Sequence, residues 1–447
     1  MVLIYGRRQS IRRWSVIKDF LNILKFIAWI GLFPFLSFLH AGNLSDLLSS
    51  EDLFSIGSEA FQERYFAENG FRWDSASKDR ARSFGHAATL EDIEIVEILA
   101  KFKENKLNTL FLSLYNKGDE ADVYTSQRVF DEKIDAVTET LDDFFGVESM
   151  SIRSSGVGSK SVKYWQKGSV LYHLNYKSGK DRSRRWIAEY INLEVKEQVG
   201  TYHAGRSRSK QSFKSKRELL VNVEKRENGS VVVGNVPMVN QGPKGYCACA
   251  TAARLLQYYG REVNQHEVAE MAGASSKGTS PDLLVDALRK IASKMKLTVK
   301  VEEDFDFKKF KKMLKDYNKL ARKKKLSEVF LPTSGTIYIS DIYGAMNPEV
   351  LVELKLKSTR KKHFLHVIEE NVKKGIPLVW SVRLGIVKEP EIPQASGGHM
   401  RLITGYNLKE KTIHYSDTWG VGHEDKTMSL DHAYAITTGL YLLNPRL

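Results

Sequence analysis

The segment that most constrains this chain joins a glutamine, a cysteine and a predicted helix. Gln241 is followed by Gly-Pro-Lys-Gly-Tyr, and Cys247 then opens an apolar, alanine-rich run that ends at Tyr259 and Gly260. Alanine and leucine favour a helix, and a glycine after such a run is typical of a helix C-terminus. A thiol at the start of a helix meets the positive end of the helix dipole and free backbone N–H groups, which favour the nucleophilic thiolate.

The residues around Cys247 also suit the oxyanion that forms when a thiolate attacks a carbonyl group. We expect the Gln241 side chain, held by the Gly-Pro-Lys-Gly turn, to donate one hydrogen bond to this oxyanion. The backbone N–H of Cys247 would donate the second. Two apolar runs flank Glu227-Asn228-Gly229, and this pattern predicts a hairpin that leads the chain to Gln241.

The chain has only two cysteines, Cys247 and Cys249, so no framework of structural disulfides is possible. A bridge between such near neighbours would close a small, strained ring. We interpret Cys249 as a small buried residue on another side of the helix. The two thiols have no partners at the spacing of a zinc finger, and we predict neither a metal nor a cofactor.

A thiol nucleophile needs a base, and His399 has the most suitable setting among the eleven histidines. Ser396-Gly397-Gly398 gives it a closely approachable backbone, and the apolar residues after it predict a buried strand. A second predicted strand, from Thr412 to Tyr415, leads to Asp417. If the two strands pair, Asp417 comes beside His399 and can orient its imidazole.

Three blocks of this sequence, QGPKGYC, GGHMRLITGYN and YSDTWG, resemble in order and spacing the active-site blocks of papain-like cysteine peptidases. The likeness is greatest to bacterial forms, namely the staphopains and the C39-like, bacteriocin-processing double-glycine peptidases with their secreted relatives. It extends from about Val231 to the C-terminus. The resemblance implies an α+β fold in which helices pack on an antiparallel sheet, and it implies these roles: Cys247 nucleophile, His399 base, Asp417 orienting acid, Gln241 oxyanion residue and Trp419 shield of the His–Asp contact.

Some residues depart from that pattern. Cys249 has no fixed counterpart in it, and Ala248 replaces a glycine or another small residue. No P-loop of an attached transporter is visible, so we do not expect a dedicated bacteriocin exporter. His414 and His423 are weaker candidates for the base, and we interpret them as strand and surface residues.

The first 41 residues predict an export signal or an N-terminal anchor. Basic residues are followed by an apolar run from Phe26 to Leu39, which is typical of a signal peptide. Cleavage near His40-Ala41-Gly42 is one expectation. An uncleaved anchor is the alternative, although the run is shorter than the roughly 20 residues that span a bilayer. Both alternatives place the body of the protein in the periplasm or outside the cell, with membrane contact only through this segment.

With 447 residues, the chain is expected to form two domains after this segment. Residues 44–203 predict a small α+β module, 204–217 a basic linker, and 218–447 the peptidase domain with an insert at about 304–359. In the module we predict helices at 90–103 and 128–145, a strand at 109–115, and three antiparallel strands at 161–166, 169–176 and 186–193. The module could be an inhibitory pro-region, a targeting module or a wall-binding module, and cleavage of the linker is a possible activation step.

The formal net charge of +14 favours anionic surroundings. In the insert, Phe310, Leu314, Tyr317 and Leu320 form a helical apolar stripe, which leaves the many lysines on the wet face. Two interpretations of this charge stay open, a solvated basic surface and a surface that binds an anionic envelope polymer. The other expected partner is a peptide or protein substrate, and we expect no specific nucleic acid. The alternatives to an exported peptidase are an envelope-binding protein without catalysis, and a thiol transpeptidase or peptidoglycan amidase.

Overall fold

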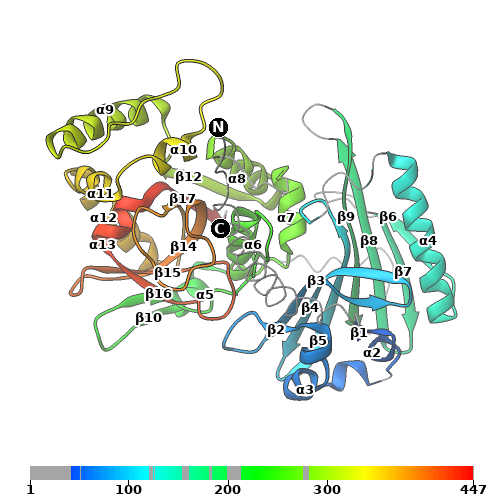
Figure 1. The fold of residues 1–447 in the computed structure, drawn as a ribbon. Coiled ribbons are helices and arrows are strands. Elements are labelled where there is room, and N and C mark those ends of the chain that lie inside the picture. The colour runs from blue at the N-terminus through cyan, green and yellow to red at the C-terminus, as the bar shows by residue number, and fades with distance from the viewer. Residues whose placement is uncertain are drawn as a thin grey trace, which may run out of the picture.

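The computed structural model describes residues 42–50, 52–119, 124, 126–153, 161–180, 184–198, 213–274 and 281–445. The predicted export signal and most of the predicted linker lie outside these residues. The described residues form two separate hydrophobic cores. One consists of residues between Leu44 and Val195, and the other of residues between Leu219 and Leu443. Figure 1 shows the corresponding two bodies side by side.

The first body, here called the module (described residues 42–198), is built on one sheet. Its strands follow the order β1-β3-β4-β5-β9-β8-β7-β6, and β2 pairs with β3. All pairings are antiparallel except that of β1 with β3. The strands are β1 (Gly42–Asn43), β2 (Arg72–Trp73), β3 (Arg80–Leu90), β4 (Ile93–Lys103), β5 (Lys106–Asn116), β6 (Met150–Arg153), β7 (Ser161–Lys167), β8 (Val170–Lys180) and β9 (Trp186–Glu197).

The helices of the module are α2 (Ser45–Ser49), the short 3₁₀ helix η1 (Leu53–Ser55), α3 (Ser58–Asn69) and α4 (Gln127–Phe145). The amphipathic α4 packs against β7 and β9 and buries Phe130, Ile134 and Leu141. It ends at Gly146 in the left-handed conformation, as its sequence predicts.

The helix predicted at 90–103 is wrong, because these residues form β4. The strand lies between β3 and β5 in the middle of the sheet and is buried along most of its length. Such a strand carries a nearly continuous apolar run instead of an alternating one, so its spacing can imitate that of a helix. The β-branched residues Ile93, Ile95, Val96 and Ile98 favour the strand.

The second body contains a sheet of the order β10-β11-β14-β13-β17-β12, and β15 pairs with both β14 and β16. Its strands, all antiparallel, are β10 (Val223–Lys225), β11 (Val231–Val233), β12 (Leu297–Glu303), β13 (Leu378–Leu384), β14 (Gly397–Asn407), β15 (Thr412–Ser416), β16 (Lys426–Ser429) and β17 (Thr437–Pro445). Its helices are α5 (Lys216–Val221), α6 (Cys247–Tyr258), α7 (Gln265–Ala272), α8 (Pro281–Met295), α9 (Phe307–Lys323), α10 (Ile339–Gly344), α11 (Pro348–Leu356), α12 (Arg360–Val372) and α13 (Leu430–Ile436).

One contact in this body positions the site: the central helix α6 packs against β14. The hairpin of β10 and β11 turns at Gly229, whose positive φ of 87° suits glycine, and leads the chain toward Gln241. The prediction of an α+β fold, with helices packed on an antiparallel sheet in the C-terminal part, is confirmed.

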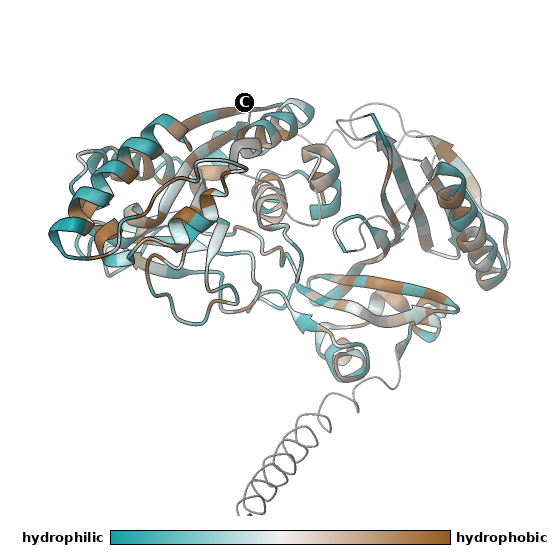
Figure 2. Cartoon of the chain, turned by 45° about the horizontal axis from the view of Figure 1, so that its top comes forward, coloured by the Kyte–Doolittle hydropathy of each residue, from teal (hydrophilic) through white to brown (hydrophobic). Residues whose placement is uncertain are grey.

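The predicted insert contains α9, α10 and α11. In α9 the residues Phe310, Leu314 and Tyr317 are buried and Leu320 is half-buried, so the predicted apolar stripe faces the core. Figure 2 shows the opposite, hydrophilic face of this helix.

The last residues of the predicted linker, Lys216 and Arg217, lie in the first turn of α5, which begins with a capping box of Ser215 and Glu218. No helix among the described residues is long and apolar enough to cross a bilayer.

Candidate active site

Cys247 is the first residue of α6 and its side chain is half-buried. The helix behind it is rich in alanine and almost completely buried, which fixes the position of its N-terminus. The buried Arg254 anchors the same helix to the chain around Asp417. Its guanidinium donates to the backbone oxygen of Asp417 and to Ser416 Oγ, both at 2.5 Å. The predicted nucleophile and the third block of the predicted site are therefore held by one buried cation.

His399 lies in β14 and its side chain is fully buried. Its Nε2 atom lies 2.5 Å from Oδ1 of Asp417. Its Nδ1 atom is buried and has no hydrogen-bond partner within standard geometry among the described residues, while the ring interacts with the Cys247 side chain. Burial by itself would lower the pKa of His399, but Asp417 and Cys247 raise it to about 9. The ring is thus held by the carboxylate at one nitrogen and has the other free for chemistry with the thiol.

Asp417 follows β15 and is completely buried. Its Oδ1 atom accepts the backbone N–H of Thr418 at 2.9 Å, and its Oδ2 atom accepts from Arg401 Nε at 2.7 Å. Burial alone would raise the pKa of this carboxyl, but His399 and Arg401 lower it below its usual value. Asp417 is therefore an ionised partner for the imidazole. Its position beside His399 agrees with the pairing of β14 and β15.

Trp419 covers the ring of His399. The two ring centroids are 4.2 Å apart and their planes deviate by 9°. An aromatic ring stacked in this way keeps water away from one face of the imidazole and from its contact with Asp417. This geometry is what a shield of the His–Asp contact requires.

Gln241 is buried, and both ends of its amide are fixed. Its Oε1 atom accepts from the Thr418 hydroxyl at 2.6 Å, and its Nε2 atom donates to the backbone oxygen of Lys244 at 3.1 Å. Its backbone N–H donates to the oxygen of Thr418 at 2.8 Å. Since an amide nitrogen carries two hydrogens, one donor remains for a ligand. The structure thus brings Gln241 into contact with the residue that follows Asp417.

The second cysteine is in a different environment. Cys249 is 2% exposed, and burial raises the pKa of its thiol to about 12. His414 bonds Asp425 and Ser230 instead of either cysteine. His423 lies against the edge of Trp419. These three residues do not join the group of Cys247, His399 and Asp417, and the described residues contain no cluster of metal-ligating side chains.

Sequence reasoning missed a buried pair behind the site. Arg401 Nη1 donates to Glu389 at 2.8 Å, and the same carboxylate accepts from Tyr415 Oη at 3.0 Å. Arg401 therefore connects Glu389 with Asp417. A signal was present, because Arg401 lies two residues after His399 in a predicted strand and so shares its face. The partner Glu389 comes from a loop, and no spacing in the sequence points to it.

Residues 233–330 and 332–440 match the model of the Peptidase_C39 like family. Among solved structures, the chain is similar to the peptidase domain of Streptococcus ComA, a bifunctional ABC transporter involved in quorum sensing, with 14% identity and a TM-score of 0.24 over 47% of this chain and 100% of that one. It is also similar to xylellain, a cysteine protease from Xylella fastidiosa, with 12% identity and a TM-score of 0.26 over 56% of this chain and 95% of that one. No curated protein matches the chain.

Proposed function

We propose that residues 233–440, which match the model of the Peptidase_C39 like family, hydrolyse peptide bonds with Cys247, His399, Asp417 and Gln241. One observation carries the proposal. His399 is held by Asp417 at Nε2, while its Nδ1 atom is unpartnered and its ring interacts with Cys247. This is the order of groups that a thiol nucleophile with a general acid–base requires.

The proposed reaction has two steps. In the first, the Cys247 thiolate attacks the peptide carbonyl carbon, and the oxyanion accepts hydrogen bonds from Gln241 Nε2 and the backbone N–H of Cys247. Protonated His399 gives its Nδ1 proton to the leaving amine, and a thioester remains on Cys247. In the second, neutral His399 takes a proton from water, the hydroxide attacks the thioester, and the thiolate leaves as the carboxylic acid product forms.

A peptide library tests this proposal with a matched pair of variants. Cys247→Ala should abolish cleavage, because the nucleophile is lost. Cys249→Ala, two residues away in the same helix, should keep most of the cleavage. That thiol is buried, and burial raises its pKa to about 12, so it is protonated at neutral pH. Equal loss in both variants, or cleavage by Cys247→Ala, would refute the assignment. Product analysis with an added amine separates hydrolysis from a transpeptidase, which would yield the amide instead of the acid.

A second candidate function rests on the solvent face of α9. Seven of its lysines are exposed, namely Lys308, Lys309, Lys311, Lys312, Lys315, Lys319 and Lys323. Together with the basic and apolar segment at the N-terminus, this face supports an exported protein that also binds an anionic envelope polymer. Binding to such a polymer that weakens with added salt and persists in Cys247→Ala is the expected result. Equal binding to a neutral polymer would rule it out.

A further inference from the structure

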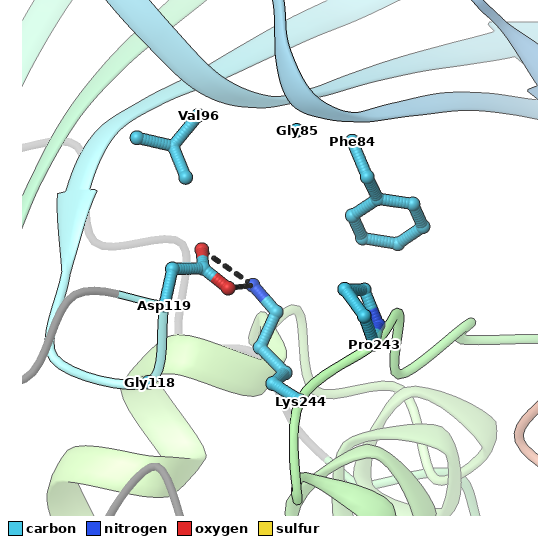
Figure 3. Close-up of a pocket in the computed structure, with 7 residues that line it drawn as sticks. All are labelled: Phe84, Gly85, Val96, Gly118, Asp119, Pro243 and Lys244. Atoms are coloured by element: carbon cyan, nitrogen blue, oxygen red, sulfur yellow. Dashed lines mark hydrogen bonds and ion pairs between the residues drawn. The ribbon is translucent and has the colours of Figure 1, made fainter. Parts of the chain in front are cut away.

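A lysine of the catalytic loop is buried against acidic residues of the module. Lys244 is 6% exposed and lies between Gln241 and Cys247. Its Nζ atom is 2.9 Å from Oε2 of Glu97 in β4 and 2.7 Å from the carboxylate of Asp119, which follows β5. Lys244 and Asp119 line a pocket of about 330 Å³ together with Phe84 and Val96 of the module, and Figure 3 shows the ion pair of Lys244 with Asp119 at its edge.

Glu97 is ionised although it is buried. Burial alone would raise the pKa of its carboxyl, but Lys244, His266 and Arg82 hold it well below the usual value. Arg82 forms an ion pair with it inside the module, and His266 Nε2 lies 3.1 Å away in the second body. A buried carboxylate with these partners is rigid, since each displacement would leave a charge without compensation.

The backbone of Lys244 in turn holds the oxyanion residue. Its carbonyl oxygen accepts from Gln241 Nε2 at 3.1 Å and from the backbone N–H of Tyr246 at 2.8 Å. The module also packs tightly on both sides of this lysine. A Cβ atom at Gly118 would lie 2.3 Å from the Tyr246 ring, and one at Gly242 would lie 2.6 Å from the Phe84 ring.

We propose that Glu97 and Asp119 of the module are positioning residues for the peptidase reaction. They fix Lys244, and Lys244 fixes the amide of Gln241 so that its second N–H points at the oxyanion. The module then supports catalysis instead of inhibiting it. This inference rests on the oxyanion role proposed for Gln241, and neither acidic residue needs to touch the substrate.

Two reactions of Cys247 distinguish a positioning effect on Gln241 from a general loss of protein stability. Peptide hydrolysis passes through an oxyanion, whereas alkylation by iodoacetamide does not and reports only on the thiol and His399. In Glu97→Gln and Asp119→Asn, kcat for peptide hydrolysis should fall about 10- to 100-fold, on the scale of a weakened oxyanion donor, with little change in KM. The alkylation rate should stay within about twofold. Asp119 lies at the edge of the network, with 15% of its side chain exposed, so its variant should fold even if Glu97→Gln does not.

Lys177→Met supplies the matched control. Lys177 joins the module to Glu270 of α7 at 3.0 Å, in the same interface but away from the catalytic loop, and this variant should hydrolyse peptides at the normal rate. The inference is overturned if Asp119→Asn keeps the normal kcat, if Glu97→Gln folds and keeps it, if hydrolysis and alkylation fall together, or if kcat rises, as removal of an inhibitory contact would cause. Cys247→Ala is measured under the same conditions. If this variant loses hydrolysis, the proposed nucleophile stands, and a negative result with the acidic variants rejects only the positioning role.

Discussion

The indole of Trp419 lies parallel to the imidazole of His399, with ring centroids 4.2 Å apart. Trp419→Ala should admit water to the His399–Asp417 contact and lower kcat/KM about 2- to 10-fold, which corresponds to the usual contribution of an aromatic pair. Trp419→Phe keeps a ring and should lose less. Steady-state kinetics of the two variants provide the measurement. Equal kcat/KM for the alanine and phenylalanine variants would contradict a shielding role.

The pH profile should reflect the raised pKa of His399. Burial lowers this pKa, but Asp417 and Cys247 raise it to about 9, so the imidazolium that protonates the leaving amine persists through neutral pH. We expect kcat/KM to fall as pH rises through about 9. In Asp417→Asn the raising charge is gone and burial remains, so this fall should move to lower pH. An alkaline limb at the same pH in both proteins would show that another group titrates there.

Arg401 should contribute strongly to stability because it neutralises two carboxylates in the interior. Arg401→Met leaves Asp417 and Glu389 without their shared cation and should lower the free energy of unfolding by about 3–5 kcal/mol. The control is Arg322→Met, which removes an ion pair of a largely exposed arginine with Glu328 and should leave the free energy of unfolding almost unchanged, because water and salt screen an exposed pair. Urea unfolding measures both. Similar losses for the two variants would contradict a structural role of the buried network.

The two cysteines should differ in reactivity. Cys249 is buried and its pKa is raised to about 12, so iodoacetamide should modify the native protein only at Cys247. A second modification should appear after unfolding in urea. Peptide mapping by mass spectrometry identifies the sites. Rapid modification of Cys249 in the native protein would be inconsistent with its buried position.

Much of the second body follows from local patterns. The alanine-rich run predicts α6, the Asn-Gly turn predicts the hairpin before Gln241, and the apolar segment after His399 predicts β14. These signals are local in sequence, so they can be identified without knowledge of the fold. The contact of His399 with Asp417 could also be expected, since the two flank a predicted hairpin.

Other features depend on contacts between distant segments. The apolar spacing of β4 resembles that of a helix because both faces of the strand are buried between β3 and β5, and its β-branched residues are the local signal that favours a strand. The contact of Glu97 with Lys244 joins two bodies, and no pattern within either segment indicates it. The contact of Arg401 with Glu389 likewise joins a strand to a loop, and no spacing in the sequence points to Glu389.

Covalent capture of the nucleophile tests the proposed triad most directly. The native protein is treated with a thiol-directed epoxide, the modified residue is mapped by mass spectrometry, and the remaining peptide cleavage is measured in the same sample. We predict that one epoxide attaches to Cys247, that cleavage is lost in proportion to the modified fraction, and that His399→Ala greatly slows the attachment. Cleavage that continues after complete modification of Cys247 would contradict its role as the nucleophile.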